Sequence, residues 1–392
     1  MLYVSGFDPK GPAHYHRLYR EQAARAGKVG GYRVEVGKRS SRCELSASWP
    51  LRFFADPAAS RPDVETEIEF LRWDDIVRDH WTRNPALLAW HFIKTTLLYL
   101  RSGALWRMAR LSWPPALLLF APFLLLLGLL ASLPAALLIG RWVADSAGSL
   151  LPGVIGGATV LAAAAGLAVW AERRMNLQWL LRSYVFTAGQ GSHGWPALER
   201  RLDEFAGLIV ERAGEPVDEL LIVAHSSGSI MAKAALARAL ALNPRLAADG
   251  PQLSLLTLGQ WSPLLSSLPS AQRFRAELAR IASDPALVWV DLTAPADGCC
   301  FALTDPIAAA GLPAKRADFP RLLSPRFAEQ FAPAAYAALR RDRLLLHFQY
   351  LMAGELPSDC DYTAITAGPL SLRERFADRP SVTDFRRFRL FG

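Results

Sequence analysis

Charged residues are scarce in this chain, and the shortage sets the first limits on what it can be. Only 20% of the 392 residues are Asp, Glu, Lys or Arg, while 52% are hydrophobic, whereas a typical globular chain carries about 25% charged residues. Disorder requires low hydrophobicity together with high net charge, and both are missing, so a disordered chain is excluded. The length allows about two or three domains.

Cysteine is also scarce, with four residues in the whole chain. This number is too small for a disulfide framework and agrees with a reducing compartment. Cys299 and Cys300 are adjacent, but neither a CxxC spacing nor a histidine at ligand spacing accompanies them, so we interpret them as buried apolar residues. His14 and His16 do not share a helix face. A GxxxxGK phosphate loop is missing as well, and we therefore expect no metal and no cofactor.

A secretory signal is not recognisable at the start of the chain. The first residues, MLYVSGFDPKG, contain neither a basic n-region nor an apolar h-region. Residues 1–6 instead have the pattern of a short strand that ends at a glycine and runs into a loop.

The hydrophobic residues are concentrated in the middle of the chain. No residue is charged over 111–140, and a second uncharged run extends over 146–171. Each run is long enough for one transmembrane helix, which needs about 20 apolar residues. We predict a two-helix transmembrane hairpin with spans at about 114–139 and 150–171, joined by roughly ten residues. The alternative is a hairpin buried in a soluble core.

Basic residues flank this hairpin on both sides, and the connection between the spans holds Arg141 and Asp145. The flanking cations are Lys94, Arg101, Arg107, Arg110, Arg173, Arg174 and Arg182. The positive-inside rule then places both flanks in the cytoplasm, so the N- and C-terminal regions are expected on the cytosolic face of the inner membrane. The net charge of +8 is explained by anionic membrane lipids, and we expect no nucleic-acid partner.

Outside the hairpin, strand and helix patterns alternate. Apolar strand-like runs at 219–224, 253–258 and 287–292 are separated by helical patterns at 227–242 and 271–282. This alternation predicts an α/β fold with a mostly parallel sheet and helices on both faces. Residues 1–84 and 183–392 are expected to form this core, and residues 85–182, which begin with an amphipathic helix over 85–110, are expected to be an insertion.

The most informative stretch is LLIVAHSSGS at 220–229, where a buried strand runs directly into a helix. Ser226 lies between Ala224 and Gly228, and this spacing matches the nucleophile elbow G-x-S-x-G with Ala in the first small position. The N–H of Ser227 is then expected to face a developing oxyanion. Centring the motif on Ser227 would place His225 where a small residue is needed. The alternative is a serine that merely caps a helix.

This stretch resembles the α/β-hydrolase superfamily in its lipase and esterase branch, where a histidine often precedes the serine. The resemblance implies a triad in the order Ser, acid, His. Among the seven histidines only His347 lies well beyond Ser226, so it is the candidate base. Asp297, in the loop after the strand at 287–292, is the favoured acid, with Asp291 and Asp305 as alternatives.

A second oxyanion donor is expected from another strand end. Ser5, Gly6, Phe7 and Asp8 follow the first strand and resemble the HG-type loops of the family. The backbone N–H of Phe7 is the candidate donor. In that case the first strand takes the place of a more central strand of the family.

Together these features predict a membrane-anchored serine hydrolase that cleaves a carboxylic ester or thioester. A lipid or acyl substrate is plausible because a site near the bilayer meets such compounds at high local concentration. A catalytically degenerate membrane scaffold and a transport or channel component are the alternatives, although two spans without internal charge disfavour a polar pathway. Acyl transfer to an alcohol stays open, and the sequence predicts no oligomeric state.

Overall fold

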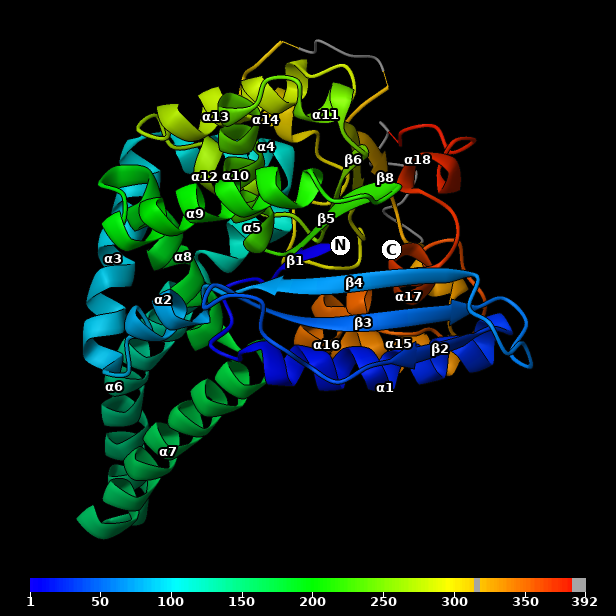
Figure 1. Cartoon of the computed structure of the whole chain (residues 1–392). Helices are drawn as coiled ribbons and strands as arrows, with labels where there is room; N and C mark the ends of the chain where they lie inside the picture. Colours follow the sequence, from blue (N-terminus) through cyan, green and yellow to red (C-terminus); the bar gives the residue numbers. More distant parts are fainter. Residues whose placement is uncertain (314–317, 383–392) are drawn as a thin grey trace.

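The computed structural model describes residues 1–313 and 318–382. Its centre is an eight-stranded sheet with the strand order β2-β3-β4-β1-β5-β6-β7-β8 (Figure 1). The strands are β1 (Leu2–Val4), β2 (Arg33–Val36), β3 (Ser46–Phe54), β4 (Val64–Leu71), β5 (Glu219–His225), β6 (Gln252–Leu258), β7 (Val288–Leu292) and β8 (Arg321–Leu323). Strand β3 is antiparallel to β2 and β4, and the other neighbouring strands are parallel. The predicted α/β class with a mostly parallel sheet is confirmed.

Helices lie on both faces of the sheet. One face is covered by α9 (Pro196–Ala213), α10 (Gly228–Leu242) and α13 (Gln272–Ser283), and the other by α1 (Pro12–Gly30) and α17 (Tyr362–Ala367). The remaining helices of this part are α2 (Asp74–Asp79), α11 (Leu246–Asp249), α12 (Ser262–Ser266), α14 (Pro306–Ala309), α15 (Pro333–Arg341), α16 (Arg343–Phe348), α18 (Leu372–Arg375), and the 3₁₀ turns η1 (Phe327–Glu329) and η2 (Gln349–Leu351).

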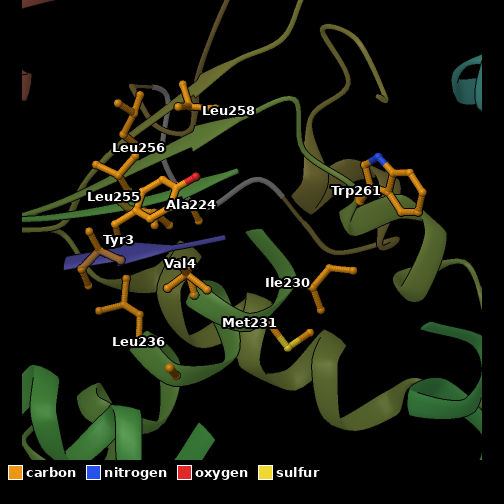
Figure 2. Packing of buried hydrophobic residues seen from close by; sticks show 14 of the residues in the cluster. Tyr3, Val4, Ala224, Ile230, Met231, Leu236, Leu255, Leu256, Leu258 and Trp261 are labelled. Carbon is orange, nitrogen blue, oxygen red and sulfur yellow. The ribbon is translucent and has the colours of Figure 1, made fainter. Parts of the chain in front are cut away.

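The core explains why the central strands are apolar throughout. Strand β5 contacts β1 on one side and β6 on the other, α10 packs on one of its faces, and all of its residues after Glu219 are buried. Side chains of both faces are therefore buried, as in parallel sheets generally. Figure 2 shows Val4 of β1 on the side of the sheet that faces Met231 of α10, and Leu256 of β6 on the opposite side. The packing holds the first turn of α10 against the sheet.

Residues 85–182, the predicted insertion, are largely helical, and the amphipathic helix predicted over 85–110 is divided into two helices at Ser102 and Gly103, where Gly103 adopts a left-handed conformation. They comprise α3 (Pro85–Arg101), α4 (Ala104–Leu111), α5 (Trp113–Leu118), α6 (Ala121–Ala147), α7 (Leu150–Met175) and α8 (Leu177–Ser192), the last of which continues beyond residue 182. Helices α6 and α7 pack along each other and project from the rest of the molecule (Figure 1). Phe123–Ala147 and Leu150–Glu172 are long and apolar enough to cross a membrane.

Small residues line the contact between these two helices. A Cβ atom on Gly153 would lie 2.4 Å from the carbonyl oxygen of Gly140, and one on Gly157 would lie 3.0 Å from that of Ala136. Larger side chains would push the helices apart. On the outside, by contrast, Leu137 and Leu150 are 76% and 82% exposed, which is unfavourable in water and favourable in lipid.

The first apolar segment differs from the prediction in its boundaries. Instead of one span over 114–139, the chain forms the short helix α5 and then the long helix α6. Pro122 stands in the first turn of α6 and supplies no N–H, so a helix cannot run unbroken from α5 through it. The candidate span is therefore Phe123–Ala147, which includes Arg141 and Asp145. The connection is also shorter than predicted, since only Gly148 and Ser149 separate the two helices.

Candidate active site

Ser226 lies at the sharp turn between β5 and α10. Its φ angle is 56°, a left-handed conformation that is unusual for a residue with a side chain. A Cβ atom on Gly228 would lie 2.4 Å from the carbonyl oxygen of Ser5, and one on Gly6 would lie 3.0 Å from Cβ of Ser226. Larger residues at these positions would separate β1 from the turn. The strained serine between small neighbours has the geometry of a nucleophile elbow.

The structure brings Ser226, His347 and Asp297 together from three distant parts of the chain. Nε2 of His347, in α16, lies 2.9 Å from Oγ of Ser226. Nδ1 of the same ring lies 2.7 Å from Oδ2 of Asp297, in the loop after β7. This arrangement fits the tautomer in which Nδ1 donates to the carboxylate and Nε2 accepts from the serine hydroxyl. All three side chains are buried.

Asp297 is held by further hydrogen bonds. Its carboxylate accepts from the Tyr350 hydroxyl at 3.1 Å and from the Cys299 N–H at 3.0 Å. Burial by itself would raise the pKa of Asp297, but His347 and these hydrogen bonds lower it overall. The carboxylate is therefore ionised at neutral pH and can stabilise a positive charge on the imidazole.

The two alternative acids lie elsewhere. Asp291, in β7, accepts a hydrogen bond from Thr257 and has Lys233 as its main positively charged neighbour. Asp305 caps α14 by accepting from the Ile307 N–H at 2.8 Å. Within the described residues, neither carboxylate is hydrogen-bonded to the histidine of the site.

The two backbone N–H groups predicted to form the oxyanion hole differ in whether they already donate a hydrogen bond. Among the residues that the structure describes, none accepts a hydrogen bond from the N–H of Ser227, at the start of α10. The N–H of Phe7, however, donates to Oγ of Ser227 at 2.8 Å. The Phe7 N–H therefore becomes available to a substrate only when the Ser227 hydroxyl turns away. The predicted hole is half occupied in this conformation.

His225 has a contact that sequence reasoning did not anticipate. Its Nε2 lies 2.9 Å from the carbonyl oxygen of His347, and the two rings are 4.9 Å apart. Burial, followed by the neighbouring His347, lowers the pKa of His225 to about 3. The ring is thus neutral and can donate from Nε2. No local pattern predicts this pairing, because 122 positions separate the partners.

The helices on either side of the apolar hairpin reach the site. Trp179, near the start of α8, donates from Nε1 to the Phe7 carbonyl at 2.8 Å, and its ring centre lies 6.0 Å from that of His347. At the other end, Cβ of Pro114 lies 3.7 Å from where a Cβ of Gly298 would stand, beside the acid loop. The segments that enter and leave the hairpin therefore cover the loops of the site.

One group of side chains has the spacing of metal ligands. Asp297, Cys299 and His347 hold their donor atoms within 4.8 Å of one another, which no other group in the described parts of the chain does. The histidine and carboxylate atoms are, however, already hydrogen-bonded to each other. Burial also raises the pKa of the Cys299 thiol, so it offers a neutral thiol and not the thiolate that metals prefer. A metal would have to break the Asp–His hydrogen bond.

Comparison with known proteins adds no family to this description. No protein-family model matches the chain, and no significant match is found among curated proteins or solved structures. The functional argument therefore depends on the geometry of the site.

Proposed function

We propose that this chain is a membrane-anchored serine hydrolase whose fold is related to the α/β-hydrolases. The observation that carries the proposal is the continuous hydrogen-bonded chain Asp297–His347–Ser226. The order of these residues in the sequence is that of α/β-hydrolases, and the serine occupies a strained turn between strand and helix. Such a combination is typical of an activated nucleophile.

The reaction follows from this arrangement. Oγ of Ser226 attacks the carbonyl carbon of an ester or thioester while Nε2 of His347 takes the hydroxyl proton. The tetrahedral oxyanion accepts a hydrogen bond from the Ser227 N–H, and from the Phe7 N–H once the Ser227 hydroxyl has turned. The bond to the leaving oxygen or sulfur then breaks, and His347 returns the proton to it. Water repeats the sequence on the acyl-enzyme and restores Ser226.

The placement of β1 supports the relationship to the hydrolases. Strand β1 lies next to β5 in the sheet, so the loop from Gly6 to Asp8 meets the elbow at the carboxyl ends of neighbouring strands. This is where a second oxyanion donor is needed. The central position of β1 in the sheet agrees with the expectation that the first strand takes the place of a more central strand of the family.

The two long apolar helices support a membrane anchor. We propose that α6 and α7 cross the inner membrane and that the catalytic body lies on its cytosolic side, because basic residues accumulate on the flanks of the hairpin. Since the helices on either side of the hairpin contact the loops of the site, the substrate is expected to approach from the membrane side. Lipid or other acyl compounds dissolved in the bilayer fit this approach.

One observation favours the alternative of a scaffold without catalysis. The Phe7 N–H is engaged by Ser227, and an incomplete oxyanion hole lowers turnover strongly, by about 10²–10³-fold for one missing donor in a known protease. A degenerate hydrolase fold would keep the triad geometry and lose the reaction. The two possibilities differ in the reactivity of Ser226.

Fluorophosphonate labelling of the full-length protein in detergent or native membranes tests the proposal. We expect labelling of the wild type, and its loss in the Ser226→Ala and His347→Ala variants. Ser283→Ala, at an exposed position in α13, serves as the control and should label normally. If thermal denaturation shows that the wild-type protein is folded and it is still not labelled, the hydrolase proposal is refuted and the scaffold is favoured.

A further inference from the structure

A groove of about 910 Å³ lies beside the loop that leads from β1 into α1. It opens between the first turn of α1, the segment that precedes β3 and the segment that follows β4. Five of its lining side chains are cations, namely Lys10, Arg17, Arg39, Arg72 and Arg78. We call this site the basic groove.

The positive charge of the basic groove is largely uncompensated. Asp74 is its single carboxylate; it is buried and forms ion pairs with both Arg72 and Arg78. These pairs hold the two guanidinium groups in place on the floor. Lys10, Arg17 and Arg39 form no ion pair within the described part of the chain. The site therefore combines two oriented arginines with three unpaired cations.

The backbone adds to this positive field. Helix α1 has 19 residues, begins at Pro12, and carries no acidic residue in its first turn and no side-chain cap. The unpaired N–H groups of a helix start bear partial positive charge and favour anions. Burial, together with Lys10, lowers the pKa of His14 in the same wall.

The basic groove is connected to the candidate active site through a short loop. Gly6 lies against Ser226, and Lys10 follows four residues later, so their Cα atoms are at most about 14 Å apart. The same loop contains Phe7, whose carbonyl accepts the hydrogen bond from Trp179 at the exit of the hairpin. An amphiphile that spans this distance would have one end at Ser226 and an anionic end in the groove.

We propose that the basic groove binds the phosphate group of a membrane amphiphile, and that it serves as the headgroup subsite for an acyl ester or thioester attacked by Ser226. Its role as a substrate subsite rests on the proposed function, whereas its role as a phosphate site does not. Arginine forks match phosphate oxygens in two parallel hydrogen bonds, which favours phosphate among anions. The adjoining apolar hairpin favours a lipid source over a soluble one.

Two triple variants with the same loss of charge provide the test. The groove variant carries Lys10→Gln, Arg17→Gln and Arg39→Gln. The control variant carries Arg20→Gln, Arg25→Gln and Lys28→Gln, at exposed positions further along α1. Both are made in the full-length Ser226→Ala protein in a nonionic detergent, so that no ligand is consumed. The ligands are a 1-acylglycerol 3-phosphate, the neutral 1-acylglycerol of the same chain length, and inorganic phosphate.

We expect the groove variant to bind the acylglycerol phosphate at least about tenfold more weakly and the control variant to change less than about twofold, because only the first loses close charge–phosphate contacts. The neutral acylglycerol should bind both variants equally. Unchanged binding in the groove variant would overturn the proposal. Inorganic phosphate that binds as tightly as the acylglycerol phosphate would overturn the assignment to a lipid.

The outcome is separable from that of the hydrolase proposal. Loss of binding in the groove variant, together with a wild type whose Ser226 is not labelled by fluorophosphonate, would establish the phosphate site and refute the hydrolase. A different outcome is that both proteins hydrolyse the acylglycerol phosphate and the neutral acylglycerol. If the ratio of kcat/KM for these two substrates is the same in the wild type and in the groove variant, the hydrolase is supported and the subsite is overturned.

Discussion

Nε2 of His225 lies 2.9 Å from the carbonyl oxygen of His347. The residue that precedes the candidate nucleophile thereby holds the main chain of the candidate base. Ser226 and His347 belong to elements 121 positions apart, and this second link joins the same two segments. We infer that His225 is a positioning residue, which keeps the imidazole of His347 within reach of the serine hydroxyl.

Replacing His225 tests this role. In His225→Ala the buried carbonyl of His347 loses its donor, which typically costs about 1–3 kcal/mol. We expect kcat to fall about tenfold or more with little change in KM. His225→Asn retains a side-chain donor and should recover part of kcat. Equal kcat values for the Ala and Asn variants would show that only the space filled by the ring matters.

The stability of the protein should depend on His225 below neutral pH. The pKa of this histidine is about 3 in the folded protein and about 6.5 when unfolded. Between these values the unfolded state binds a proton that the folded state excludes, so stability falls as pH decreases. The loss is about 1.3 kcal/mol at pH 5.5 relative to pH 7. Urea unfolding at pH 7 and 5.5 should show this slope in the wild type and a smaller slope in His225→Asn.

Asp297 and Asp291 should respond differently to replacement by asparagine. Asp297→Asn removes the charge that orients the catalytic imidazole, and by analogy with other triads kcat should fall by about 10³–10⁴-fold. Asp291→Asn should leave kcat within about threefold, since the structure places Asp291 beside Thr257 and among the charged neighbours of Lys233. Comparable losses of kcat in both variants, measured on soluble folded protein, would contradict the assignment of the acid.

The buried cation Lys233 is a stability feature separate from the site. Its ammonium donates to Oγ of Ser262 at 2.6 Å and lies 5.1 Å from the ring centre of Trp289. Burial lowers the pKa of Lys233 and raises that of Asp291, and each charge opposes the shift of the other. Lys233→Met leaves the buried Ser262 hydroxyl without its donor and should cost about 1–3 kcal/mol. The double variant with Asp291→Leu should be more stable than the sum of the two single losses predicts.

Trp179 should control access to Ser226. The indole bridges the Phe7 carbonyl and the His347 ring, while the serine itself is buried. We expect Trp179→Ala to increase the labelling rate by a water-soluble fluorophosphonate about threefold or more, because a covering side chain is removed. Trp106→Ala, at an exposed tryptophan of α4, is the control. A labelling rate that does not change in Trp179→Ala would show that substrate enters by another route.

Local patterns predicted much of the architecture. The bounds of β5, β6, β7, α10 and α13 differ from the predicted ranges by one residue at most at each end, because their apolar periodicity and flanking turn residues are local properties. Strand β8 was missed, since Arg321–Leu323 is too short to show a pattern. Ser46 to Ser48 of β3 show no strand pattern either, because they are polar or small and are buried through pairing with β4.

The chain by itself determined the two apolar helices, the parallel α/β core and the serine of the elbow, because each depends on residues close together in sequence. Contacts between distant segments decided the rest. They selected Asp297 over Asp291, joined His225 to His347, and placed the Phe7 N–H on the Ser227 hydroxyl. Such contacts depend on which strands become neighbours in the sheet and on where the loops at their ends meet, and no local sequence pattern records that.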